Sequence, residues 1–134
     1  MATVTESIDL TAAPEAVWAL VGDPASLSDW HPAVATAEVT DGVRRCALAG
    51  GGGIVEPILE HSDQERFYMY GLTESPLPVH DCRSRVSVEA TAGGSRLVWS
   101  AEFEPDDPAA AQELSEMVSG LYSAGLAAVR DRLD

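Results

Sequence analysis

The C-terminal segment constrains the fold of this chain more than any other part of the sequence. Asp107-Pro108 can begin a helix with a capping side chain. Apolar residues then recur with the helical period, at Leu114, Val118, Leu121, Tyr122, Ala128, Val129 and Leu133. An amphipathic helix of about 25 residues is long for a small domain, and a broad sheet is needed to cover its apolar face.

The rest of the sequence predicts such a sheet. Thr3 to Leu10 alternates in polarity like a strand, and two short helices follow, with Pro14 and Pro24 at their first positions. From residue 33 to 105, turn signals separate six further strands, at Asp41-Gly42, Gly50 to Gly53, Ser62-Asp63, Ser75-Pro76 and Gly93-Gly94. We therefore expect one α+β domain over residues 1–134, with a seven-stranded, curved antiparallel sheet around the last helix.

Charge excludes several classes of partner. The chain has eight basic residues, all Arg, against 22 acidic ones, for a net charge of -14. This surface repels phosphate backbones and anionic lipids, so neither nucleic acid nor a membrane is an expected partner. The start has no signal-peptide pattern, and we expect a cytoplasmic protein. Cys46 and Cys82 are not spaced like metal ligands, and we expect no metal and no cofactor.

Strand alternation predicts which residues face the interior. In the last strand Trp99 and Phe103 must face the helix, because Glu102 and Glu104 would otherwise be buried. Pairing along the meander then places Glu56 opposite Tyr70, beside Arg44. A pocket between sheet and helix follows, and its predicted ligand-binding residues are Trp30, His31, Cys46, Leu48, Ile58, Tyr68, Leu72, Leu77, Cys82, Ser84, Val86, Trp99, Phe103, Val118, Leu121 and Tyr122.

Two interpretations of the central polar group remain open. Arg44 and Glu56 can form a structural ion pair that Tyr70 helps to satisfy. Alternatively, Glu56 acts as a general base or ligand anchor, and Tyr70 donates to a substrate oxygen. His80 is expected to face inward at the entrance loop Glu74 to Val79, where it could also activate Cys82.

The order of these pieces resembles the START-related superfamily, often labelled SRPBCC, and within it the small bacterial polyketide cyclase/dehydrase-like branch. The resemblance covers nearly the whole chain and is carried by Ala13-Pro14-Glu15-Ala16-Val17-Trp18, Trp30-His31-Pro32, Gly42-Val43-Arg44, Val55-Glu56, Tyr70, Glu74-Ser75-Pro76-Leu77-Pro78-Val79, Val98-Trp99 and Phe103-Glu104-Pro105. It implies the helix-grip fold. One departure is His80-Asp81-Cys82, where relatives are expected to have a Tyr three residues beyond Val79.

The resemblance implies a ligand that is small and hydrophobic, polyketide-like or aromatic. One hypothesis is a cofactor-independent cyclase or dehydratase, a lyase or isomerase of biosynthesis, with Glu56, Tyr70, His80 and Arg44 as candidate catalytic residues. The other is a carrier or sensor without catalysis. Either protein could be a monomer or a homodimer.

Overall fold

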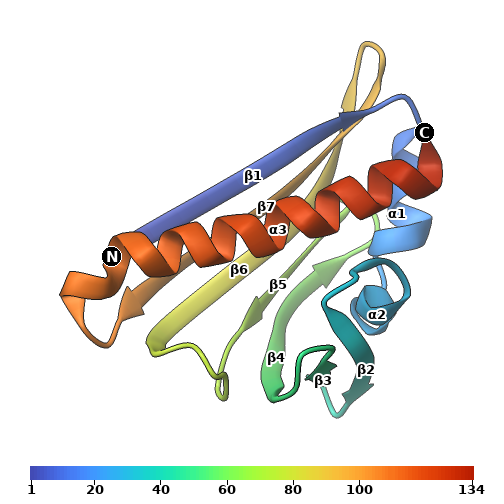
Figure 1. The fold of residues 1–134 in the computed structure, drawn as a ribbon. Coiled ribbons are helices and arrows are strands. Elements are labelled where there is room, and N and C mark those ends of the chain that lie inside the picture. Colours follow the sequence, from blue (N-terminus) through green and yellow to red (C-terminus); the bar gives the residue numbers. More distant parts are fainter.

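The computed structural model describes residues 1–134 and arranges seven strands around one long helix (Figure 1). Strand β1 is followed by two short helical segments, six consecutive strands and the C-terminal helix. The elements are β1 (Ala2–Leu10), α1 (Pro14–Val21), η1 (Pro24–Ser26), α2 (Leu27–Trp30), β2 (Val34–Thr40), β3 (Val43–Leu48), β4 (Gly53–Ser62), β5 (Phe67–Gly71), β6 (Val79–Thr91), β7 (Gly94–Pro105), η2 (Pro108–Ala110) and α3 (Ala111–Leu133).

The sheet is antiparallel throughout, in the order β1-β7-β6-β5-β4-β3-β2. Figure 1 shows α3 lying along β1 and β7, with α1 and α2 at the end of the molecule where α3 finishes. The sheet curves from β1 to β2 around the space beneath α3. The predicted α+β helix-grip architecture is therefore confirmed. None of the helices is long and apolar enough to cross a membrane.

Local sequence signals explain where the helices begin. The Asp23 side chain accepts a hydrogen bond from the amide of Ala25 at 2.9 Å, and the Asp107 side chain accepts one from Ala109 at 3.0 Å. These contacts satisfy amides that the first helical turn leaves unpaired. Both short 3₁₀ segments then continue into α-helices, so the two predicted helix starts are correct.

The core lies between α3 and the concave face of the sheet. Leu97, Trp99 and Phe103 are almost fully buried, as the alternation of β7 predicts. The Tyr122 ring stacks on the Trp99 indole, with ring centroids 4.0 Å apart and planes 7° from parallel. Leu121 was expected in the same interior and lines the same cavity as Trp99 and Tyr122, where it is 38% exposed.

Two strand irregularities change the predicted register. On β6, Asp81 and Cys82 together oppose a single residue of β7, and Asp81 has a positive φ of 51°. Between β4 and β5 the register also shifts by one residue, so Tyr70 lies opposite Ile58. The expectation that Glu56 lies opposite Tyr70 is wrong by two residues, because the β4–β5 turn is centred between Gln64 and Glu65 and not at Asp63.

Candidate functional site

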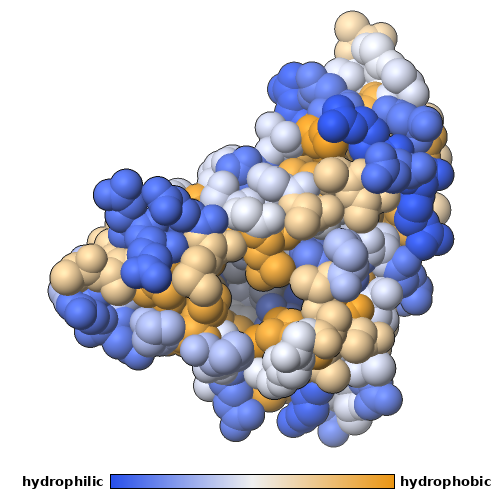
Figure 2. Space-filling model, in the orientation of Figure 1, coloured by the Kyte–Doolittle hydropathy of each residue, from blue (hydrophilic) through white to orange (hydrophobic).

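A pocket opens between α3 and the concave face of the sheet, with lining residues on β2 to β7. Its volume is about 510 Å³, and 18 of its 25 lining residues are hydrophobic. Figure 2 shows it as a hollow near the centre of the molecule, with hydrophobic residues around its rim. A cavity in the range of roughly 300–1,000 Å³ with apolar walls and few polar groups is typical of small-molecule sites.

Most residues predicted to bind ligand lie on the pocket wall. The predicted residues that line it are His31, Leu48, Glu56, Tyr70, Leu72, Leu77, Cys82, Ser84, Trp99, Phe103, Val118, Leu121 and Tyr122. A second group does not line the pocket and lies behind its wall, partly or fully buried, namely Trp30, Arg44, Cys46, Ile58, Tyr68 and Val86. The roles assigned to both groups remain predictions.

Other lining residues were not predicted as ligand-binding. They are Leu27, Ala33, Val34, Ala49, Gly50, Gly51, Ile54, Ser75, Pro76, Val79, Ala101 and Met117. Several belong to the β3–β4 hairpin. The glycine run in the sequence predicts a turn there, but it does not indicate that the turn folds against the pocket. Ser75, Pro76 and Val79 flank Leu77 in the entrance loop, where the two prolines were a usable signal.

Arg44 and Glu56 form a buried ion pair across β3 and β4. The two residues lie opposite each other in the register, and Arg44 Nε donates to Glu56 Oε1 at 2.8 Å. Arg44 is 0% exposed and Glu56 is 5% exposed. Taking both charges out of water has a large desolvation cost, which the close contact offsets. The predicted proximity of this pair is confirmed.

The remaining contacts of the guanidinium come from behind the pocket wall. Arg44 Nη1 donates to the Pro24 carbonyl at 3.0 Å and to the Tyr68 hydroxyl at 3.1 Å. The Tyr70 ring lies under the guanidinium, 4.6 Å from Cζ to the ring centroid. Tyr68, and not Tyr70, therefore provides the hydroxyl that helps to satisfy the pair. Arg44 Nη2 has no hydrogen-bond partner.

Glu56 has one oxygen that the protein does not use. The hydrogen bond from Arg44 and the weaker contact from the Cys46 thiol both reach Oε1. Nothing in the protein donates to Oε2, yet this oxygen is not among the fully sealed polar atoms, so it keeps access to the pocket. Burial raises the pKa of the Glu56 carboxyl, and the nearby Arg44 charge opposes that increase.

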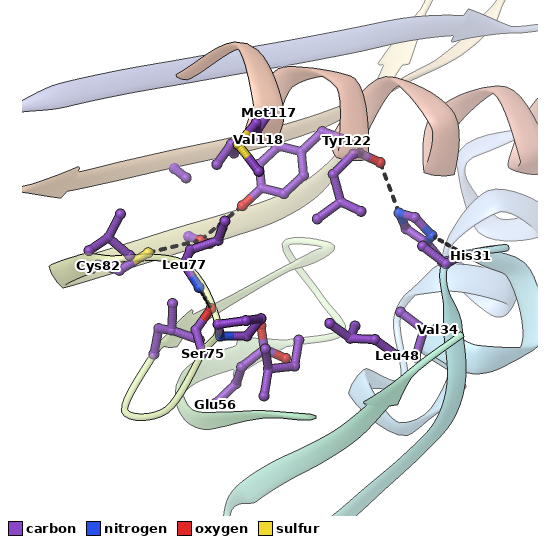
Figure 3. Close-up of a pocket in the computed structure, with 18 of the residues that line it drawn as sticks. His31, Val34, Leu48, Glu56, Ser75, Leu77, Cys82, Met117, Val118 and Tyr122 are labelled. Atoms are coloured by element: carbon purple, nitrogen blue, oxygen red, sulfur yellow. Dashed lines mark hydrogen bonds between the residues drawn. The ribbon is translucent and has the colours of Figure 1, made fainter. Parts of the chain in front are cut away.

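Hydroxyl groups of Tyr70, Ser84 and Tyr122 form a second polar part of the pocket wall. Trp99 Nε1 donates to the Tyr70 hydroxyl at 2.9 Å. The Tyr122 hydroxyl lies 3.1 Å from Ser84 Oγ, and the Cys82 sulfur lies 4.0 Å from the same oxygen. Figure 3 shows this chain of contacts running from α3 to β6 across the pocket from Glu56. Burial raises the pKa of Tyr122 to about 12, so its hydroxyl keeps its proton at neutral pH.

His31 is held on both of its ring nitrogens. Nδ1 accepts from the Ala33 amide at 3.1 Å, which leaves Nε2–H to donate to the Leu121 carbonyl at 2.8 Å (Figure 3). Burial lowers the pKa of this imidazole, consistent with a neutral ring. Its ring also lies where a side chain on Gly125 would clash. Such a fully bonded residue fixes the end of α2 against α3.

His80 does not face the pocket, contrary to the prediction. The bulge at Asp81 turns it to the outer side of the sheet, where the side chain is 55% exposed and Nδ1 lies 2.7 Å from Asp106 Oδ1. Cys82 therefore has no imidazole beside it, and burial raises the pKa of its thiol. A nucleophilic thiolate at Cys82 is not supported. No group of three or more His, Cys, Asp or Glu residues is arranged to hold a metal ion.

Comparison with known proteins agrees with this geometry. A family model described as polyketide cyclase/dehydrase and lipid transport matches residues 1–134. The solved structure of XoxI from Bacillus cereus shares 34% identity, with a TM-score of 0.94 over 99% of this chain and 96% of that one. An uncharacterized protein from Bacillus thuringiensis shares 32% identity, with a TM-score of 0.93 over 98% of both chains.

A more distant likeness extends to an aromatase/cyclase. The Zhui aromatase/cyclase from a Streptomyces species has a TM-score of 0.80, over 98% of this chain and 92% of that chain. Its sequence identity is 18%, so the likeness shows the shared fold alone. No curated protein matches the sequence.

Proposed function

The chain belongs to the polyketide cyclase/dehydrase and lipid transport family, and on that premise we propose that it binds a small hydrophobic molecule and acts on it as a cofactor-independent cyclase or dehydratase. The substrate is polyketide-like or aromatic in this proposal. The Streptomyces protein, which shares the fold, is an aromatase/cyclase. Because one fold carries many activities, the proposal depends on the pocket itself.

One observation carries the proposal: Glu56 presents a carboxylate oxygen without a protein partner to an otherwise apolar pocket. In such surroundings Oε2 accepts a proton from a carbon or hydroxyl of the bound molecule. The Tyr70 hydroxyl, oriented by Trp99, donates a hydrogen bond to a substrate oxygen that gains negative charge. The apolar walls exclude water that would compete for reactive intermediates.

A carrier or sensor is the second candidate, and a different observation favours it. Arg44 neutralises Glu56, and both nitrogens of His31 are already bonded within the protein. The pocket therefore contains no free imidazole, which is the most common general acid and base in enzymes. In this case the ion pair serves stability, and the pocket only holds its ligand.

Identification of the natural ligand tests the proposal. Small molecules extracted from the purified protein are identified by mass spectrometry, and each is then incubated with fresh protein. Conversion that the Tyr70→Phe variant slows supports the enzyme. A molecule that binds tightly and is recovered unchanged supports the carrier, and absence of any hydrophobic ligand contradicts both.

A further inference from the structure

The pocket wall contains one charged side chain. Of the 25 lining residues only Glu56 carries a charge at neutral pH. His31 also lines the pocket, but its two hydrogen bonds hold the ring in the neutral form. None of the eight Arg residues lines the pocket. A bound molecule therefore meets a carboxylate and no cation.

Arg44 cannot serve as a cation for the ligand. It is fully buried and does not line the pocket. Its Nε and Nη1 already donate within the protein, and Nη2, which has no partner, is itself sealed from solvent. A carboxylate or phosphate in the pocket would lose its water and face Glu56 without a counter-charge. An ammonium group would also bind poorly, because Arg44 already balances the charge of Glu56 and one further positive charge would be left uncompensated.

An uncharged hydrogen-bond donor fits the site instead. Glu56 Oε2 is an acceptor with no partner in the protein. On the neighbouring strand β5, the Tyr70 hydroxyl accepts from Trp99 and keeps its own proton to donate. The two positions complement a molecule with a hydroxyl facing Glu56 and a second oxygen facing Tyr70.

We infer that the pocket selects uncharged hydroxyl compounds, such as phenols or enols on an apolar skeleton, and rejects carboxylates, phosphates and ammonium ions of the same size. This inference rests on the proposed function and defines the substrate class of that site. It excludes fatty acids and phosphorylated lipids as ligands.

Matched naphthalene probes test the inference on the wild-type protein. Isothermal titration calorimetry at pH 7 compares 2-naphthol, 2-methoxynaphthalene and 2-naphthoate. The methoxy compound is one methyl group larger than the hydroxyl compound and cannot donate a hydrogen bond, so we expect it to bind roughly 10- to 100-fold more weakly. Naphthoate is expected to bind more weakly still.

The outcomes separate this inference from the proposed function. Naphthoate binding as tightly as naphthol, or equal binding of all three probes, would overturn the selectivity and leave the hydrophobic pocket intact. If no probe binds, the proposed function fails and the inference fails with it.

A charge-free variant provides a second test that does not leave Arg44 unpaired. In the double variant Arg44→Met/Glu56→Gln both charges of the pair are removed together, which buried pairs commonly tolerate. Circular dichroism checks that it is folded. We expect the affinity of this variant for naphthoate to approach its affinity for naphthol. If it still prefers naphthol over naphthoate as strongly as the wild type does, Glu56 does not cause the selectivity.

Discussion

Arg44 Nε lies 2.8 Å from Glu56 Oε1, and the two residues occupy opposite positions on β3 and β4. This pair determines what the pocket can do chemically, because it places a carboxylate at an apolar wall and hides the cation behind it. Glu56 consequently has two functions in our account. Oε1 compensates the buried guanidinium, and Oε2 faces the ligand.

Gly125 is predicted to be essential for the contact between α3 and His31. A Cβ at this position would lie 2.6 Å from His31 Cδ2 and 3.0 Å from Trp99 Cζ3. We expect Gly125→Ala to lower the free energy of unfolding by about 1–2 kcal/mol, since overpacking outweighs the better helix propensity of Ala. Thermal unfolding followed by circular dichroism measures the loss.

Gly120 provides the matched control on the same helix. A Cβ there would meet nothing within 4 Å, and the residue is exposed. Gly120→Ala should therefore stabilise the protein by up to about 1 kcal/mol. Equal effects of the two substitutions would contradict the close packing of His31 and Trp99 against α3.

His31 should make the protein less stable in mild acid. Burial lowers the pKa of the folded residue below its ordinary value of 6.5, so the unfolded chain binds the proton more readily. As the pH falls from about 6.5 through the folded pKa, protonation favours unfolding and stability is lost. Melting temperatures between pH 7.5 and 5 should decrease.

His31→Gln is the control for that pH dependence. The variant should be less stable at pH 7.5, because it loses the contacts with Ala33 and Leu121, and its melting temperature should vary less between the two pH values. An unchanged slope in the variant would assign the pH dependence to another group.

His80 should be dispensable for the pocket. Its side chain is exposed and pairs with Asp106 on the outer side, and this contact raises the pKa of the imidazole. Exposed pairs contribute little to stability. We expect His80→Ala to bind 2-naphthol with wild-type affinity in calorimetry, and a tenfold loss would show that the bulge at Asp81 does not keep His80 outside.

The sequence was sufficient for the architecture because its strongest signals are local and repeated. Pro24 after Asp23 and Pro108 after Asp107 mark helix starts, and the alternation in β7 identifies Trp99 and Phe103 as interior. The pairing of Arg44 with Glu56 also followed, because the glycine run fixes the β3–β4 register without an irregularity.

The error at His80 arises where one extra residue interrupts a strand. Alternation predicts that His80 lies on the same face of the sheet as Cys82. The extra residue at Asp81 puts the part of β6 that precedes it out of step, so His80 faces the outer side. This bulge has no glycine to mark it, since Asp81 itself adopts the positive φ of 51°. Tyr70 was misplaced for another reason, since the β4–β5 turn is centred between Gln64 and Glu65, beyond the Ser62-Asp63 signal.

The most direct test of the account is the turnover of Glu56→Gln on the molecule that copurifies with the protein. Loss of the charge leaves Arg44 uncompensated and should reduce stability by about 3–5 kcal/mol, so the rate is measured at a temperature where circular dichroism shows the variant folded. With Glu56 as general base, the rate should fall roughly 10²- to 10⁴-fold. Turnover at the wild-type rate by the folded variant would contradict the central claim that Glu56 Oε2 carries the chemistry.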